Sequence, residues 1–261
     1  MSFKAAKGLV RALTPEPVKA LAQSLRWHAR VRRILRAFGG DSGFSVKSGP
    51  FKGMRYVSQS PWGGLIPRLI GYYEQELHPI LDRIFQRRYD TVIDVGCAEG
   101  YYAVGLALRL PEAQVYAFDT DAQARAVCAD IGARNDVTPR LHIRELCDAR
   151  ALNGMALNNA LIVCDCEGFE VDLLDPVAVP GLSRCDMLVE THDHLRPGAL
   201  ATLEQRFGAT HVINKVVSIV REDADYPQFA HLTVEDRNWA LSEGRPCRMY
   251  WLFLQAKPAG T

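Results

Sequence analysis

The sequence predicts an α/β fold, in which a mostly parallel sheet is covered by helices on both faces. Three observations lead to this fold class. From residue 91 onward, short apolar runs alternate with stretches of helical periodicity. The last two apolar runs have no strong helical pattern between them, which predicts an antiparallel pair that closes the sheet. A chain of 261 residues, 48% of them hydrophobic, is long enough for one such domain and an extension.

Residues 1–40 are expected to form a basic helical extension. Nine Lys or Arg and one acid give residues 1–38 a charge of +8, which leaves −7 on the rest of the chain. The segment "TPEP", Thr14 to Pro17, predicts the start of a helix with Pro15 or Pro17 in its first turn, and "GGDSG" predicts its end. Two interpretations stay open: a solvated helix on its own domain, or an interfacial helix that contacts anionic lipid or a partner. Nucleic acid is not expected, because no recognition module accompanies the charge.

Residues 41–90 are expected to lead into the core. Residues 44–58 alternate loosely and contain Gly-Pro and Lys-Gly turn signals, which predict a small hairpin. Residues 66–85 carry apolar side chains at helical spacing and predict one helix.

The core is expected to span residues 91–261. Residues 221–246 would form a long inserted loop, a lid in which Asp225, Tyr226 and Phe229 shape a binding pocket. The predicted strands are Thr91–Val95, Gln114–Phe118, Arg140–Arg144, Ala160–Cys164, Asp186–Thr191 and two runs within 210–220 and 247–257. The predicted helices are Tyr101–Arg109, Ala122–Arg134, Phe169–Leu174 and Ala199–Phe207.

The cellular setting is predicted from what the sequence lacks. No run of about 18 apolar residues predicts a transmembrane helix, and no apolar h-region indicates a secretory signal. The seven cysteines include no C-x-x-C pair, so we expect reduced thiols and no structural metal on cysteine. These features favour a cytoplasmic protein, and the basic extension leaves a place at the inner membrane surface open.

The loop "DVGCAEGYY" after the first predicted strand carries the first functional signal. Its glycines, Gly96 and Gly100, lack the G-x-G-x-x-G spacing of a dinucleotide site, with Ala98 between them. The carboxylate of Glu99 would repel a pyrophosphate but would tolerate an ammonium or sulfonium group. Asp119 ends the second predicted strand and could accept both hydroxyls of a ribose. Adenosine with a cationic amino-acid tail fits both features, so the expected ligand is S-adenosylmethionine and not NAD.

Several motifs together resemble a known family. "DVGCAEG", "AFDTD" and "LIVCDCEGFEVDLL", with "IGYYEQEL" before the first strand, resemble class I SAM-dependent methyltransferases, and among them the FkbM-type O-methyltransferases. The resemblance covers residues 65–200 and is carried by the D-x-E-G-x-E segment, Asp165 to Glu170. It implies a Rossmann-like seven-stranded sheet whose last strand is antiparallel. The cofactor residues that we expect are Asp94, Gly96, Cys97, Ala98, Glu99, Gly100, Tyr101, Asp119, Thr120, Asp148 and Asp165.

The expected catalytic groups follow the fourth and fifth strands. Asp165 and Glu167 lie where open α/β sheets place substrates, and an extended backbone would point both the same way. One would orient the acceptor and the other would take its proton, unless they cap the next helix. His192 is an alternative base, since its ordinary pKa suits the task, although His192 and His194 could be plain loop residues. Mg²⁺ between Asp165, Glu167 and Asp193 is a further open interpretation.

The sequence therefore predicts a SAM-dependent O-methyltransferase that acts on a hydroxyl of a small molecule or glycan, with a sugar-type acceptor favoured. Oxygen is preferred because "DCEG" occupies the place where enzymes that methylate planar nitrogens commonly carry Asn-Pro-Pro-Tyr. Two alternatives remain: an N-methyltransferase on a peptide or amine, and a non-catalytic SAM-fold scaffold that binds a membrane or partner through residues 1–38.

Overall fold

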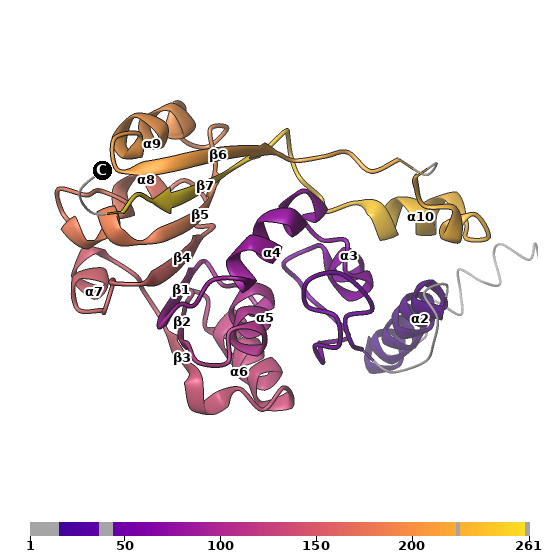
Figure 1. Cartoon of the computed structure of the whole chain (residues 1–261). Helices are drawn as coiled ribbons and strands as arrows, with labels where there is room; N and C mark the ends of the chain where they lie inside the picture. Colours follow the sequence, from indigo (N-terminus) through magenta and orange to yellow (C-terminus); the bar gives the residue numbers. More distant parts are fainter. Residues whose placement is uncertain (1–15, 37–43, 223–224, 259–261) are drawn as a thin grey trace, which may run out of the picture.

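The sheet has seven strands in the order β3-β2-β1-β4-β5-β7-β6 (Figure 1). Strands β1 to β5 are parallel, and β7 is antiparallel to both of its neighbours, β5 and β6. The predicted Rossmann-like α/β architecture, a seven-stranded and mostly parallel sheet with an antiparallel last strand, is confirmed. The strands are β1 (Thr91–Val95), β2 (Gln114–Phe118), β3 (Leu141–Arg144), β4 (Ala160–Cys164), β5 (Asp186–Thr191), β6 (His211–Val217) and β7 (Tyr250–Ala256).

The computed structural model describes residues 16–36, 44–222 and 225–258. The first 15 residues of the basic extension and the predicted helix stop "GGDSG" therefore lie outside the described residues. All seven cysteines lie within them and are free thiols, as expected. No helix in the described ranges is long and apolar enough to cross a membrane.

Helices cover both faces of the sheet because its central strands are buried on both sides. Every residue of β1, β4 and β5 is buried, which explains why these strands read as continuous apolar runs. Val92 points to one core and Ile93 to the other. The first core contains α4 (His78–Phe85), α5 (Tyr101–Arg109) and α6 (Ala122–Arg134), and the second contains α7 (Ala149–Asn153), α8 (Glu170–Leu173) and α9 (Ala199–Phe207).

The single helix predicted over residues 66–85 is wrong. The chain forms α3 (Leu65–Ile70), a 3₁₀ turn (Gln75–Leu77) and then α4. Gly71 ends α3 in the left-handed region at φ 84°, and a Cβ there would lie 2.0 Å from the Ser48 carbonyl oxygen. The hairpin predicted over residues 44–58 forms as a short antiparallel pairing, with a bridge between Ser45 and Arg55. Backbone hydrogen bonds join Val46 to Gly53 and Met54, and Phe44 to Tyr56.

The inserted segment is also more ordered than a long loop. It contains a 3₁₀ turn (Pro227–Phe229) and the helix α10 (Val234–Leu241), whose N-cap Thr233 accepts a hydrogen bond from the Asp236 backbone N–H. Tyr226 and Phe229 are buried in the core beside Tyr72, so they do not shape the pocket as expected.

The N-terminal helix α2 (Glu16–Arg36) begins where the sequence predicts and packs on α10. The rings of Trp27 and Trp239 meet edge to face at 4.6 Å, and Arg30 donates to Asp236 at 2.6 Å. Figure 1 shows α2, α3 and α10 gathered on one side of the molecule, away from the sheet. Contact of residues 1–38 with a membrane stays a prediction.

Candidate active site

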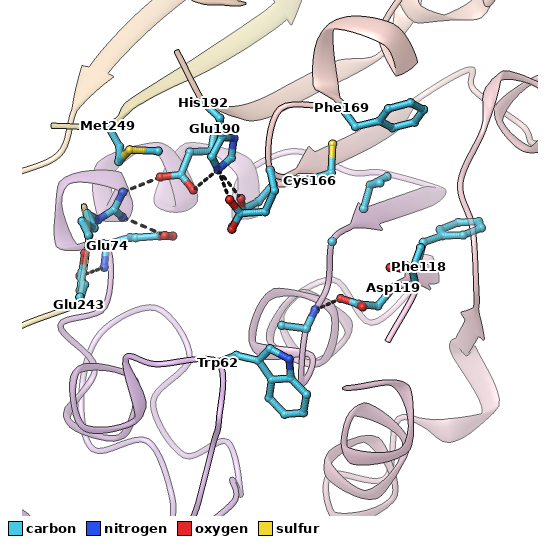
Figure 2. A pocket seen from close by; sticks show the side chains of 18 of the residues that line it. Trp62, Glu74, Phe118, Asp119, Cys166, Phe169, Glu190, His192, Glu243 and Met249 are labelled. Carbon is cyan, nitrogen blue, oxygen red and sulfur yellow. Dashed lines mark hydrogen bonds and ion pairs between the residues drawn. The ribbon is translucent and has the colours of Figure 1, made fainter. Parts of the chain in front are cut away.

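A cavity of about 760 Å³ opens at the carboxyl end of the parallel strands. This is the edge where open α/β sheets bind ligands, beside the point where the strand order reverses between β1 and β4. The ends of β1 to β5 and the loops after them supply most of its wall, and residues within 61–74 and 243–249 supply the rest. Figure 2 shows Asp119 on one side of the cavity and Glu190 and His192 on another.

The two glycines of the loop after β1 have different structural roles. Gly96, at φ 80°, lines the cavity, and a Cβ there would lie 1.7 Å from the carbonyl oxygen of Asp165. A side chain would therefore collide with the end of β4. Gly100 is needed for helix packing instead, because its Cβ would lie 2.6 Å from the sulfur of Cys128 on α6.

Asp119 is fixed at the cavity wall by two backbone amides. Its Oδ2 accepts from the Ala98 N–H, the dashed contact drawn at Asp119 in Figure 2, and its Oδ1 accepts from the Asp121 N–H, both at 2.8 Å. A carboxylate has about four acceptor sites, so both oxygens keep capacity for a further donor. The group is half-buried and lines the cavity. It can thus accept hydrogen bonds from a ligand that carries two adjacent hydroxyls.

The predicted cofactor residues divide into two sets. The first set lines the cavity: Gly96, Ala98, Asp119, Thr120 and Asp165. The second set lies outside its lining: Asp94, Cys97, Glu99, Gly100, Tyr101 and Asp148.

Glu99 shows why the local sequence could not reveal that residues of the second set lie outside the cavity lining. The side chain turns into the protein, where its Oε1 accepts from Arg68 at 2.6 Å and from Tyr56 and Ser60 at 2.8 Å. Its charge is therefore balanced by Arg68, a partner 31 residues away in the sequence. Only the other oxygen, Oε2, is buried without a hydrogen-bond partner.

The remaining residues of the second set support the loop or a helix. Asp94 is buried below the loop, and burial together with the nearby Asp165 raises its pKa to about 8. Tyr101 packs edge to face against Phe51, Tyr56 and Tyr73. Asp148 is the N-cap of α7 and accepts from the Ala151 N–H at 2.7 Å.

The predicted catalytic residues do come together, around His192. The Nε2 atom lies 3.3 Å from Asp165 Oδ1, 3.6 Å from Glu167 Oε2 and 3.8 Å from Glu190 Oε2. Asp165 and Glu167 converge through a turn and not through an extended strand, because β4 ends at Cys164 and Glu167 has φ 54°. A residue other than glycine in the left-handed region is strained, and such residues cluster at functional sites.

Glu170 holds the histidine from behind. It is fully buried, accepts from the His192 backbone N–H at 2.9 Å, and lies 3.4 Å from Nδ1. It also accepts from the Gly168 N–H at 2.8 Å, which ties the turn after β4 to the end of β5. The second glutamate of D-x-E-G-x-E therefore orients His192, so that Nε2 faces the other carboxylates.

The charge state of His192 differs from the expectation. Burial lowers its pKa, but Asp165, Glu170 and Glu190 outweigh that effect and raise the pKa to about 11. The ring is then an imidazolium at neutral pH, so the expectation of a neutral histidine base with an ordinary pKa is not met.

The carboxylate set considered as a possible Mg²⁺ site is not assembled. Asp193 turns away and accepts from the backbone N–H groups of Gly198 and Leu200, both at 3.2 Å, at the start of α9. A set of a different composition lies close together instead: ligand atoms of Asp165, Glu190 and His192 are all within 4.8 Å of one another.

Several charged groups of the cavity escaped the sequence analysis, and Arg245 has the most ionic partners among them. Arg245, from the inserted segment, pairs with Glu190 at 2.5 Å, Glu243 at 2.7 Å and Glu74 at 3.0 Å. Burial raises the pKa of Glu74 to about 8 against the opposing effect of Arg245. The partners lie up to 171 residues apart, so no local pattern joins them. The charges of "SEGRP" in an otherwise loop-like segment were the available signal.

No family model matches the sequence, and no curated protein matches it. Among solved structures, the fold is similar to a precorrin-6Y C5,15-methyltransferase from Geobacter metallireducens, with 14% identity, a TM-score of 0.49, and 70% of this chain and 89% of that chain covered. It is also similar to a candidate O-methyltransferase from Klebsiella pneumoniae, with 14% identity, a TM-score of 0.47, and 96% of each chain covered. At these values, the likenesses assign neither a reaction nor an acceptor to this chain.

Proposed function

We propose that the protein is a SAM-dependent O-methyltransferase of the FkbM type, which methylates a hydroxyl of a small molecule or glycan. The observation that carries the proposal is the geometry of Asp119. Two backbone amides hold its carboxylate at the cavity wall. One of these amides is that of Ala98, which belongs to the glycine loop itself. A ribose diol on Asp119 would place the rest of the cofactor over Gly96, where no side chain intervenes.

The walls of the cavity suit the two ends of this cofactor. Beyond Asp119, the apolar side chains of Phe118, Leu146 and Phe169 line the cavity and offer a surface for an adenine ring. Seven carboxyl groups line the cavity, against two arginines and the His192 imidazolium. Burial raises the pKa of two of the seven, Glu74 and Glu190, and the other five still outnumber the three cations. This negative surplus favours the sulfonium and ammonium groups of SAM.

The same surplus bears on the acceptor. A phosphorylated or carboxylated acceptor would be repelled, whereas an uncharged polyol such as a sugar would not. A sugar-type acceptor is therefore supported, and a protonated amine is the second class that the charge would admit.

The chemistry is an in-line displacement in which alignment supplies much of the rate. The acceptor oxygen forms a bond to the methyl carbon as the carbon–sulfur bond breaks, and S-adenosylhomocysteine leaves. The acceptor proton passes to a carboxylate, and we assign this role to Glu167 because its side chain is 77% exposed at the cavity. Asp165, next to the His192 imidazolium, would orient the acceptor hydroxyl.

The first experiment measures ligand binding by calorimetry with SAM, S-adenosylhomocysteine and NAD⁺. We expect the two sulfur ligands to bind and NAD⁺ not to bind. Asp119→Ala should weaken S-adenosylhomocysteine about 10- to 100-fold, since hydrogen bonds to a charged group contribute about 1.5–3 kcal/mol. Asp148→Ala is the matched control, because it removes an aspartate outside the cavity lining, and its affinity should equal the wild type. Binding of NAD⁺ alone would overturn the proposal.

The second experiment distinguishes hydroxyl acceptors from amine acceptors and tests Glu167 as the group that takes the proton. With a hydroxyl acceptor found by screening sugars against amines, Glu167→Gln should keep cofactor affinity and lower turnover by a factor on the order of 10² to 10⁴. Normal turnover in Glu167→Gln would show that another group takes the proton. Turnover on amines only would exclude the O-acceptor.

A further inference from the structure

We propose that Asp165, Glu190 and His192 form a binding site for a divalent first-row transition metal ion such as Mn²⁺, with Glu170 as the residue that positions the histidine. The site lies at the cavity edge between the ends of β4 and β5. Binding of the ion does not depend on the function proposed above. Its use in catalysis does rest on that function.

The first argument is geometric. From His192 Nε2, the oxygens of Asp165 and Glu190 are 3.3 Å and 3.8 Å away, longer than good hydrogen bonds. Metal–ligand distances of about 2.0–2.2 Å place neighbouring ligand atoms roughly 3 to 4 Å apart. The two separations from His192 thus match the spacing of ligands around an ion, and all three ligand atoms lie within 4.8 Å of one another. Figure 2 shows Glu190 and His192 converging there.

The second argument is independent of that spacing and concerns what each group lacks. The Asp165 Oδ1 atom is buried without a hydrogen-bond partner. Glu190 commits its Oε1 to Arg245, which leaves Oε2 directed toward His192. The His192 side chain is only 3% exposed, so its Nε2 does not contact bulk solvent and faces three carboxylates instead.

Glu170 provides the third argument. A histidine that binds a metal almost always presents its other ring nitrogen to a carboxylate or carbonyl, which fixes the ring orientation. Here Glu170, fully buried, occupies that place beside Nδ1 and also accepts from the histidine's own backbone N–H. This arrangement of carboxylate and histidine is the one that metal sites use, and a bound ion would take the place of the proton on Nε2.

The donor set selects the class of ion. Mg²⁺ prefers oxygen ligands and keeps several waters, whereas an imidazole nitrogen suits first-row transition metals. One nitrogen with two carboxylate oxygens therefore favours Mn²⁺ or a similar ion over Mg²⁺. Placed there, the ion could hold an acceptor hydroxyl beside Glu167 and lower the pKa of that hydroxyl.

The test uses the full chain after treatment with EDTA. Mn²⁺ is added, and the loss of the free-ion signal in electron paramagnetic resonance reports binding. We expect one tight ion per chain, with affinity lowered more than 10-fold in His192→Gln and Asp165→Asn. Glu170→Gln, which keeps the ligands, should lower it about 10- to 100-fold. Glu145→Gln is the matched control, since it removes a carboxylate of the same cavity outside the cluster, and its affinity should equal the wild type.

Binding of S-adenosylhomocysteine in EDTA, measured on every variant, separates the two proposals. A chain that binds this ligand but no Mn²⁺ overturns the metal site and leaves the proposed function standing. A chain that binds Mn²⁺ through these residues but neither sulfur ligand supports the metal site and overturns the function. Mn²⁺ affinity that is unchanged in both His192→Gln and Asp165→Asn also overturns the site.

Discussion

At the scale of single residues, Gly96 connects backbone geometry with the cavity. Its φ of 80° is unfavourable for a residue with a side chain, and the carbonyl oxygen of Asp165 fills the place of a Cβ. Gly198 has nearly the same φ, 85°, but no atom lies within 4 Å of its would-be Cβ. Substitution at Gly198 therefore measures backbone strain alone, whereas substitution at Gly96 adds a steric collision.

We expect Gly96→Ala to destabilise the protein by more than about 3 kcal/mol and to abolish S-adenosylhomocysteine binding. Gly198→Ala should cost only the strain of the left-handed region, about 1–2 kcal/mol, and keep binding. Urea denaturation and calorimetry measure the two effects. Equal losses of unfolding free energy at the two positions would mean that the backbone at the end of β4 moves aside without a measurable penalty.

Asp94 makes a prediction about pH. Its folded-state pKa is raised from 3.8 to about 8, mainly by burial, with Asp165 and Asp119 adding to the effect. The folded state therefore binds more protons than the unfolded state between about pH 4 and 8, and its stability falls as pH rises through that window.

In Asp94→Asn this loss should be absent. Between pH 5 and 8, the wild type should lose more stability than the variant, by an amount on the order of 3 kcal/mol. Urea denaturation at several pH values measures the difference. Parallel pH profiles for the two proteins would show that Asp94 is ionised in the folded state.

At the scale of elements, the sequence predicted the strands well and the inserted segment poorly. Buried parallel strands such as β1 and β4 read as continuous apolar runs, which have few alternative interpretations. The break at Gly71 depends on Ser48, and the burial of Phe229 depends on Tyr72 and its neighbours, so both are decided by distant contacts. For α10 the signal was present, because Thr233 three residues before Asp236 is a capping pattern.

The contact between α2 and α10 supports a prediction at this scale. The ring centroid of Trp239 lies 4.6 Å from that of Trp27 and 4.7 Å from the Cζ atom of Arg30. We expect Trp239→Ala to speed amide hydrogen exchange in residues 23–36 at least ten-fold, while β1 and β4 stay protected. Arg26→Ala, an exposed position on the same helix, is the control and should leave exchange unchanged. Equal exchange in both variants would mean that α2 is held by other contacts.

At the scale of the whole molecule, the cavity joins parts that the sequence keeps far apart. Asp119 and Gly96 follow neighbouring strands, and their motifs made this wall of the cavity predictable. Another part of the wall combines Glu74, Glu190 and Arg245, which meet only when the inserted segment folds back over β5. Sequence patterns indicate which groups end a strand, but not which group a distant loop brings to them.

The proposed function predicts how S-adenosylhomocysteine should act on the stability of the whole molecule. A ligand that binds only the folded chain stabilises it by about 2.7 kcal/mol at a concentration 100 times its Kd. For a domain of this size, each kcal/mol raises the Tm by roughly 2–4 °C, so S-adenosylhomocysteine should raise the Tm by roughly 5–11 °C. The same concentration of NAD⁺ should leave the Tm unchanged, and Asp119→Ala should shift the stabilisation to 10- to 100-fold higher ligand concentration. Differential scanning calorimetry measures both, and an equal rise with NAD⁺ would contradict a cavity selective for the sulfur ligands.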